Sequence, residues 1–245
     1  MKKKLIILTG PTAVGKTDLS IRLARTVGGE IISADSMQVY RRMDIGTAKI
    51  RPEEMDGVRH HLIDILEPTE SFNAFLFKEY ALKAANEIWE RGSIPIIVGG
   101  TGFYIQTLLY DIEFAKSDEN DGIRDELNKL YEEHGAAFLH DMLAKVDPEY
   151  AAEVHENNVK KVIRAIEFYR QTGHKLSEHN TEQRERTSPY NFEYFVLSDD
   201  RTVLYERIDK RIDGMVEAGL IAEVQALLDE GVDRRSVAMQ GLGYK

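Results

Sequence analysis

The chain has 245 residues, of which 42% are hydrophobic, so it is long enough for one sizeable core with a smaller appended unit. The sequence has no cysteine, which excludes disulfides and thiolate metal sites, and no apolar run approaches the roughly 18 residues that cross a bilayer. A formal net charge of −10 argues against a protein that coats nucleic acid, although it permits one local basic groove. We expect a cytoplasmic, monomeric protein with no membrane partner.

The first part of the chain alternates short apolar runs with amphipathic stretches. Residues 5–8 predict a buried strand, and residues 16–27 predict a helix that ends at a pair of glycines. A second strand begins at residues 31–32, and residues 73–92 predict another helix. Residues 94–104 begin as a fully buried strand that breaks at two glycines. Alternating strands and helices indicate a parallel sheet with helices on both faces and ligands beyond the carboxyl ends of the strands.

The pattern changes near residue 115. Four stretches with helical periodicity follow, at residues 121–135, 135–147, 148–155 and 157–173. No clear strand appears until residues 191–198, and a last stretch, residues 201–231, predicts two helices. We therefore expect an α/β core with a helical insertion. The expected ranges are 1–115 and 187–245 for the core and 116–186 for the insertion. The second half of the insertion, residues 155–186, holds seven Lys or Arg against five Asp or Glu, so it is the part suited to a polyanion.

A glycine-rich stretch, GPTAVGKT at residues 10–17, fits the P-loop pattern G-x-x-x-x-G-K-[ST]. Its glycines let the backbone wrap around an anion, Lys16 adds a full positive charge, and the Thr17 hydroxyl is a ligand for Mg²⁺. The stretch follows an apolar strand and opens an amphipathic helix, which is the context that the pattern requires. This phosphate loop predicts a P-loop NTPase-like core that binds a polyphosphate, without indicating which one.

An acid follows the second strand. Asp35 comes directly after the apolar run that begins at Ile31, whereas the strand at residues 94–99 ends in glycines, and Asp64 is a weaker candidate. An acid at a strand end beside a phosphate loop often holds Mg²⁺. From the residues alone, Asp35 is equally a magnesium ligand, a general base or a solvated loop acid.

Several stretches read together are more specific than the phosphate loop. They are GPTAVGKT, SADSMQVYRRMDIGTAK, HHLIDI, IIVGGTGFYI and NNVKKVIRAIE. In this order they resemble the tRNA dimethylallyltransferases, also called tRNA isopentenyltransferases, over nearly the whole chain. The resemblance implies transfer of a dimethylallyl group from dimethylallyl diphosphate to the exocyclic amine of the adenosine 3′-adjacent to the anticodon. It also implies that the helical insertion grips the anticodon arm of tRNA.

The resemblance assigns the phosphate loop to the donor diphosphate, with Mg²⁺ as cofactor. The loop residues are Gly10, Pro11, Thr12, Ala13, Val14, Gly15, Lys16 and Thr17. Asp35 matches the aspartate that takes a proton from the acceptor amine, a role worth roughly 10²- to 10⁴-fold in rate. Arg211 matches an arginine near the diphosphate, with a solvated helix charge as the alternative.

The resemblance also assigns residues that contact tRNA. They are Asp35, Ser36, Met37, Gln38, Thr101, Arg124, Lys160, Lys161, Val162, Ile163 and Arg164. Two of these assignments have simpler alternatives: Thr101 as a helix N-cap, and the lysines as an exposed helix face. For the adjacent His60 and His61 we favour packing or hydrogen bonding over a metal site, because neighbouring residues on an extended segment point to opposite faces.

The chain departs from the pattern of the resemblance in two places. Lys160 and Lys161 stand where many relatives have Gln-Arg or Arg-Arg, which keeps charge but loses bidentate phosphate geometry. The final LGYK, residues 242–245, replaces a VGYR-like segment that relatives follow with further basic helix. From this end we expect a truncated form whose phosphate site is intact and whose hold on tRNA is reduced.

Two other functions fit the phosphate loop. A P-loop kinase of a nucleoside or small metabolite would use Asp35 to deprotonate a hydroxyl and would consume ATP. A non-catalytic tRNA-binding protein would use the loop for a structural nucleotide and would turn over neither ATP nor an allylic donor. The stretch DSMQVY with MDIGTAK favours the transferase.

Overall fold

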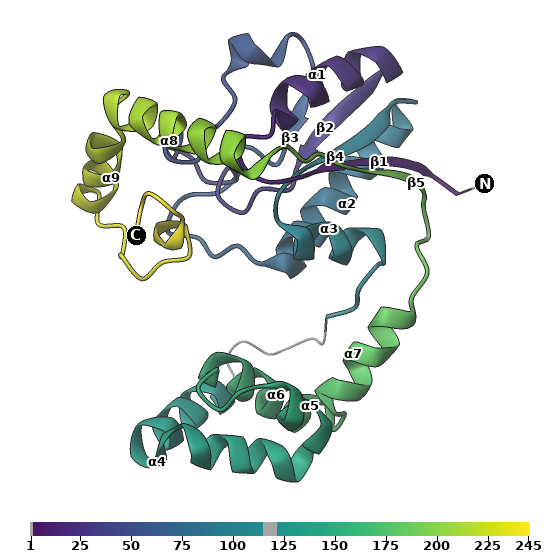
Figure 1. Cartoon of the computed structure of the whole chain (residues 1–245). Helices are drawn as coiled ribbons and strands as arrows, with labels where there is room; N and C mark the ends of the chain where they lie inside the picture. The colour runs from purple at the N-terminus through teal and green to yellow at the C-terminus, as the bar shows by residue number, and fades with distance from the viewer. Residues whose placement is uncertain (1, 115–121) are drawn as a thin grey trace. The chain divides into compact units, whose positions relative to one another are not determined.

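The computed structural model describes residues 2–114 and 122–245, which form two units (Figure 1). The core unit comprises Met1–Asp111 and Ser188–Lys245, and the insertion unit comprises Ile112–Thr187. The expected boundary at residues 186 and 187 falls one residue before the observed one. The other expected boundary, at residues 115 and 116, lies outside the described residues.

The core unit is built on one five-stranded sheet whose paired strands are all parallel. In sheet order its strands are β3 (His60–His61), β2 (Gly29–Ser33), β4 (Ile94–Gly99), β1 (Lys4–Thr9) and β5 (Asn191–Val196). Because β1 lies between β4 and β5 and is followed directly by the phosphate loop, the loop lies at the carboxyl edge of the sheet, next to the outermost strand β5. The predicted parallel α/β fold is confirmed.

Helices cover both faces of this sheet (Figure 1). The helices of the core unit are α1 (Lys16–Val27), α2 (Ala74–Glu90), α3 (Gly102–Leu109), α8 (Arg201–Glu217) and α9 (Leu220–Asp229). Alternation along the strands explains the two layers: Ile31 and Ile96 pack against α1, whereas Ile32 and Ile97 pack in the core formed with α2 and α3. Burial of each of these isoleucine side chains stabilises the folded state by about 1.5–3 kcal/mol.

The sequence indicated helix α3 only through the alternative of Thr101 as a helix N-cap, because its residues are apolar and directly follow the apolar strand β4. The chain leaves β4 at Gly99 and turns into α3 after Thr101. Tyr104, Ile105 and Leu108 then face the core at helical spacing. An apolar run without polar alternation does not distinguish a strand from a buried helix.

The insertion unit is helical, as predicted. Its elements are α4 (Ile123–Val146), α5 (Pro148–Glu153), α6 (Val159–Thr172) and α7 (Leu176–Glu185). Gly135 interrupts α4 with φ 82° and ψ 179°, at the residue where two separate helices were predicted to meet. The unit has its own hydrophobic core, in which Leu139 and Leu143 of α4 pack with Val162 and Ile166 of α6.

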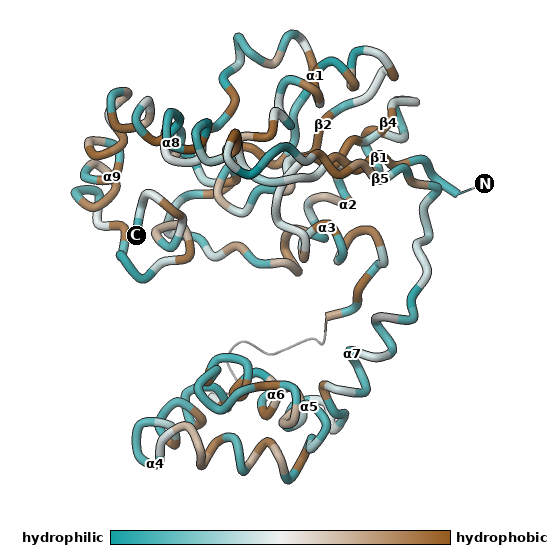
Figure 2. Tube along the Cα trace, viewed as in Figure 1, coloured by the Kyte–Doolittle hydropathy of each residue, from teal (hydrophilic) through white to brown (hydrophobic). Residues whose placement is uncertain are grey.

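Hydrophobic residues concentrate inside the core unit, where Figure 2 shows β1 and β4 in brown. The helices of both units show teal and brown in alternation along the chain, as amphipathic helices do. Among the residues that the structure describes, no helix is both long and apolar enough to cross a membrane.

Candidate active site

The carboxyl ends of three neighbouring strands meet at close quarters. A Cβ atom on Gly99 would lie 2.3 Å from the carbonyl oxygen of Ala34, so the ends of β4 and β2 can approach this closely only because residue 99 is glycine. The backbone N–H of Thr101 donates to the same Ala34 oxygen at 3.3 Å. On the other side, the Thr9 hydroxyl at the end of β1 donates to the Gly99 carbonyl at 2.9 Å. These contacts bring the phosphate loop, Asp35 and Thr101 to one edge of the sheet.

The phosphate loop takes the conformation that its glycines permit. Gly10 has φ 149° and Gly15 has φ 91°, and Ala13 also lies at a positive φ of 64°. Gly15 is the N-cap of α1, so the loop runs directly into the positive end of that helix. A Cβ atom on Gly10 would lie 2.5 Å from the Leu197 carbonyl oxygen, which closes the base of the loop against the end of β5.

Lys16 folds back over its own loop. Its Nζ donates to the carbonyl oxygens of Gly10 at 2.8 Å and Pro11 at 2.7 Å. Thr17, the next residue, is exposed, and its hydroxyl makes no hydrogen bond within the described parts of the chain.

Asp35 is held by its own loop. Its Oδ1 accepts hydrogen bonds from the backbone N–H of Met37 at 2.8 Å and of Gln38 at 3.3 Å. Its Oδ2 has no partner among the residues that the structure describes. The side chain therefore has a fixed orientation and one carboxylate oxygen available to a substrate.

Asp35 acts electrostatically on the two cations of the site. Burial lowers the pKa of Lys16, whereas the negative charge of Asp35 raises it and the positive charge of Arg211 lowers it further. Burial likewise lowers the pKa of Arg211, opposed by Asp35. The predicted cluster of Lys16, Asp35 and Arg211 is therefore brought together, with two cations around one carboxylate.

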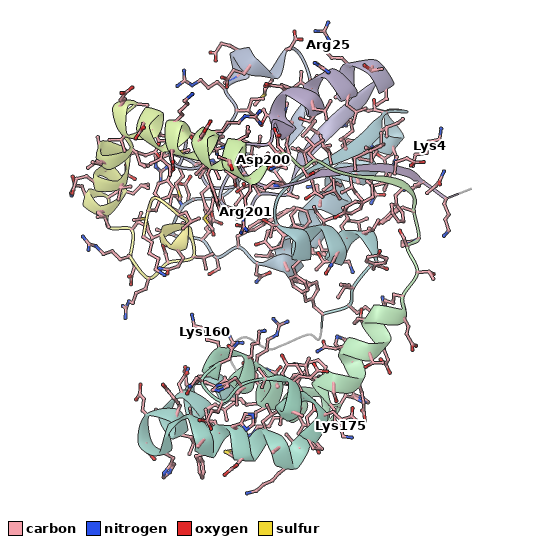
Figure 3. The ribbon with its side chains drawn as sticks, viewed as in Figure 1. Lys4, Arg25, Lys160, Lys175, Asp200 and Arg201 are labelled. Carbon is pink, nitrogen blue, oxygen red and sulfur yellow. The ribbon has the colours of Figure 1, made fainter. Side chains whose placement is uncertain are left out.

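Helix α8 carries a second arginine that the sequence did not single out. Arg207 lies one helical turn before Arg211; its Nη1 is 3.5 Å from the Ala13 carbonyl oxygen of the phosphate loop and 2.8 Å from Asp199 Oδ2. The helix begins beside these groups, with Asp200 as the N-cap that accepts from Thr202 N at 2.8 Å (Figure 3). An arginine four residues before Arg211 on a helix is the sequence signal for Arg207.

Two further residues stand near Asp35. Thr101 occupies the N-cap position of α3, but its side chain makes no capping hydrogen bond with any described residue, so the capping alternative is not realised. Burial raises the pKa of Tyr104 to about 12, and the negative charge of Asp35 raises it as well. The phenol therefore lies close enough to Asp35 to feel its charge; the sequence placed Tyr104 in an apolar run and gave no signal for this.

The residues after Asp35 are partly exposed, and two of them, Met37 and Gln38, contact other parts of the core unit. The Gln38 amide accepts from the Ser33 hydroxyl at 3.0 Å and donates to the Thr47 carbonyl at 3.3 Å. Met37 lies against Gly241, where an added Cβ would come within 2.9 Å of its sulfur. The conformation of this loop therefore depends on segments distant in sequence.

The basic run of α6 separates into two faces. Lys160, Lys161 and Arg164 are exposed, and Figure 3 shows Lys160 projecting from the start of the helix. Val162 and Ile163 are only 0% and 5% exposed and pack in the core of the insertion unit. Because the side chains of Val162 and Ile163 are buried in this core, they are not available to contact tRNA. Contact with tRNA stays a prediction for Lys160, Lys161 and Arg164.

Arg124 makes an intramolecular ion pair. Its Nη2 lies 2.5 Å from Oε2 of Glu167, whose side chain is 9% exposed. This pair joins α4 to α6. A contact between Arg124 and tRNA stays a prediction.

The two adjacent histidines are hydrogen bonded, as interpreted from the sequence. His60 Nδ1 lies 2.9 Å from the Val58 carbonyl oxygen, and His61 Nε2 lies 2.7 Å from Glu30 Oε2. Across residues 2–114 and 122–245, no group of three or more His, Cys, Asp or Glu is arranged to hold a metal.

Comparisons with known proteins agree on one family. A family model described as IPP transferase matches residues 38–245. The tRNA dimethylallyltransferase of Lachnoclostridium phytofermentans is 58% identical over 98% of this chain and 77% of its own length. That of Carboxydothermus hydrogenoformans is 49% identical over 100% of this chain and 78% of its own length.

Solved structures give the same result. The full-length tRNA isopentenylpyrophosphate transferase of Bacillus halodurans has a TM-score of 0.69 and 47% identity, covering 99% of this chain and 75% of its own. A eukaryotic dimethylallyltransferase acting on tRNA has a TM-score of 0.85 and 34% identity, covering 97% of this chain and 59% of its own. Because the family model spans most of the chain and the 58% identical relative spans 98% of it, this protein is a member of the tRNA dimethylallyltransferase family.

Proposed function

We propose that this enzyme transfers the dimethylallyl group of dimethylallyl diphosphate to N6 of the adenosine 3′-adjacent to the anticodon of tRNA. The observation that carries the proposal is the carboxylate of Asp35, which has one oxygen without a partner among the described residues and interacts with Lys16 and Arg211. A base beside a cationic phosphate loop suits a reaction in which an amine displaces a diphosphate.

The phosphate loop stabilises the leaving group in this proposal. As the bond between C1 of the dimethylallyl group and its phosphate oxygen breaks, the bonding electrons stay with the diphosphate. Lys16, Arg211 and the positive end of α1 compensate the added negative charge where it develops. The interactions of Lys16 with two loop carbonyls give way to interactions with the diphosphate oxygens.

Asp35 removes the proton that the acceptor amine must lose. The lone pair of N6 is delocalised into the purine, so the amine is a poor nucleophile. As N6 bonds to C1, Asp35 Oδ2 takes one N6 proton, which leaves a neutral substituted amine and free diphosphate. General base catalysis of this kind contributes roughly 10²- to 10⁴-fold.

Mg²⁺ fits the donor set of the site. The Thr17 hydroxyl would hold the ion, and the lack of a carboxylate cage within the described residues suits Mg²⁺, which keeps waters and takes substrate phosphate oxygens as ligands. When bound, the ion supplies positive charge that stabilises the departing diphosphate.

The adenine must leave its stack to reach Asp35, which costs a few kcal/mol. Ser36, Met37 and Gln38, which are partly exposed beside the base, and the exposed cations of α6 are suited to the contacts that offset this cost. Lys160, Lys161 and Arg164 would contact phosphates of the anticodon arm.

The substitution Asp35→Asn tests the proposal. We expect it to lower the single-turnover rate of dimethylallyl transfer at least about a hundredfold, while the tRNA dissociation constant stays nearly unchanged. Asp229→Asn, the same change at an exposed position on α9, is the control. A wild-type rate in Asp35→Asn would remove this carboxylate from the mechanism, and ATP consumption without allylic transfer would favour the kinase.

A further inference from the structure

Glu223 of α9 binds a loop of the core unit through three successive backbone N–H groups. Its Oε2 accepts from Asp44 N at 3.0 Å and Ile45 N at 2.9 Å, and its Oε1 accepts from Gly46 N at 3.2 Å. Successive N–H groups that converge on one carboxylate form an anion nest. The side chain thereby fixes residues 44–46, although it lies 177 positions or more away in sequence.

Tyr244 completes the same arrangement. Its hydroxyl donates a short hydrogen bond to Glu223 Oε1, and burial followed by this hydrogen bond raises the pKa of the phenol. The Tyr244 ring packs so closely on Gly46 that an added Cβ there would lie 2.5 Å from it. The tyrosine is 5% exposed, so the arrangement is part of the folded core.

The loop held by Glu223 leads directly to Asp35. Residue 47 follows the nest, and its carbonyl oxygen accepts from the Gln38 side chain at 3.3 Å. The backbone N–H of Gln38 donates in turn to Asp35 Oδ1 at 3.3 Å. One continuous chain of hydrogen bonds and covalent backbone therefore runs from Glu223 through residues 44–47 and Gln38 to the carboxylate of Asp35.

We propose that Glu223 is a positioning residue for the transfer reaction, which orients the carboxylate of Asp35 through residues 44–47 and Gln38. The inference rests on the proposed role of Asp35 as the base. The inference assigns a function to the hydrogen bonds between Glu223 of α9 and the MDIGTAK stretch, residues 43–49. None of these groups takes part directly in the proposed reaction. Lys49 supports the same loop, since its buried ammonium lies 2.6 Å from both Asp44 Oδ1 and Asp64 Oδ1.

Glu223→Gln tests the inference. The amide keeps the size of the side chain but replaces one accepting oxygen with an N–H donor that faces backbone N–H groups. A misplacement near 1 Å can cost about a hundredfold in rate, so we expect kcat to fall about 10- to 100-fold. The KM for dimethylallyl diphosphate stays within about twofold, because the donor loop does not contact Glu223. Tyr244→Phe, which removes one partner, gives a smaller change in the same direction.

Glu217→Gln is the matched control, because it makes the same charge change at an exposed position near the end of α8. A second readout is independent of activity: amide hydrogen exchange of the full chain by NMR. In Glu223→Gln we expect protection to fall at residues 44–46 and also at Met37 and Gln38, whereas Glu217→Gln leaves both unchanged.

Unchanged kcat in Glu223→Gln, or unchanged protection at Met37 and Gln38, overturns the inference. A parallel loss of kcat, donor affinity and melting temperature also overturns it, because it would indicate a merely structural role. Asp35→Asn, measured alongside, separates the two proposals. If that variant retains full activity, the proposed role of Asp35 fails, whereas an inactive Asp35→Asn with a fully active Glu223→Gln contradicts the positioning role alone.

Discussion

Lys16 and Asp35 differ in when they act on the substrates. Lys16 lies within the phosphate loop, so it meets the diphosphate before and during bond breaking, whereas Asp35 is needed only as the amine gives up its proton. A contact made equally in both states contributes to binding, and one that strengthens in the transition state contributes to the rate. The two side chains therefore predict different kinetic signatures.

Lys16→Ala is expected to weaken donor binding and turnover together. A hydrogen bond to a charged group is worth about 1.5–3 kcal/mol, so donor affinity falls about 10- to 100-fold. Calorimetric titration with dimethylallyl diphosphate measures the affinity, and Lys210→Ala, at an exposed position of α8, is the control. Donor affinity equal to that of the unaltered protein would contradict the assignment of the loop.

At the scale of single residues, the sequence located the site residues that belong to a recognisable sequence motif or stand at the end of a predicted strand. The phosphate loop follows its pattern residue by residue, and Asp35 stands where a strand ends. Arg207 and Tyr104 carry no such mark: the first is one charge among many on α8, and the second belongs to an apolar run. Their positions depend on which helix face turns toward the loop, a property of packing across the sheet.

Asp147 joins two elements of the insertion unit. It is the N-cap of α5, where its Oδ1 accepts from Tyr150 N at 3.1 Å. The same carboxylate accepts from Ser177 N at 2.9 Å and Ser177 Oγ at 2.7 Å, at the start of α7. Asp147 is only 1% exposed. Water therefore cannot replace its hydrogen bonds when they are lost.

The stability of the insertion unit should therefore depend on pH through Asp147. Burial alone would raise the pKa of its carboxyl, but hydrogen bonds from Ser177 and Tyr150 outweigh burial and lower it. A carboxyl with a depressed folded-state pKa stabilises the fold above its unfolded pKa of about 3.9, and this stability disappears as the pH falls through the folded value.

Asp147→Asn should lower the free energy of unfolding by about 1–3 kcal/mol at pH 7. The difference between the two proteins should shrink as the pH falls below the unfolded pKa of about 4. Urea titrations followed by circular dichroism at 222 nm measure both, with Asp141→Asn at an exposed position of α4 as the control. A difference that stays constant down to low pH would show that the charge of Asp147 is not the stabilising group.

At the scale of elements, hydrophobic periodicity predicted the helices whose own sequence is amphipathic. Helix α4 and its break at Gly135 follow from the sequence, because the break needs a left-handed residue and glycine supplies it. Helix α7 was missed because its polar sequence has few apolar residues, and its start is held by the Asp147 carboxylate instead. A tertiary hydrogen bond of this kind leaves no local pattern.

At the scale of the whole molecule, two units divide the work of the proposed reaction. The core unit contains every group assigned to the chemistry, and the insertion unit carries the exposed cations of α6. The sequence predicted this division because strand and helix signals alternate along the core, whereas residues 116–186 carry helix signals and no clear strand signal. Because the net charge of the chain is −10, we expect the contact with the tRNA polyanion to be confined to a local group of cations such as those of α6.

Replacement of Lys160, Lys161 and Arg164 by alanine should weaken tRNA binding and flatten its salt dependence. Each lost phosphate contact lowers the log–log salt slope by about 0.7 to 0.9, so the slope should fall by about two units or more. The double variant Lys129→Ala, Lys145→Ala removes exposed cations of α4 and is the control. An unchanged slope in the triple variant would move the RNA contact away from this face.

The most direct measurement follows the allylic group itself. The chain is incubated with dimethylallyl diphosphate labelled at C1, Mg²⁺ and unmodified tRNA. One portion of the RNA is then digested to nucleosides to identify the labelled atom, and another is cut into oligonucleotides and sequenced by mass to locate the labelled residue. We expect one labelled N6-dimethylallyl adenosine per modified tRNA, at the residue 3′-adjacent to the anticodon, with an equal amount of diphosphate released and no need for ATP. Label at another atom or position, or diphosphate release without label in the RNA, would contradict the account.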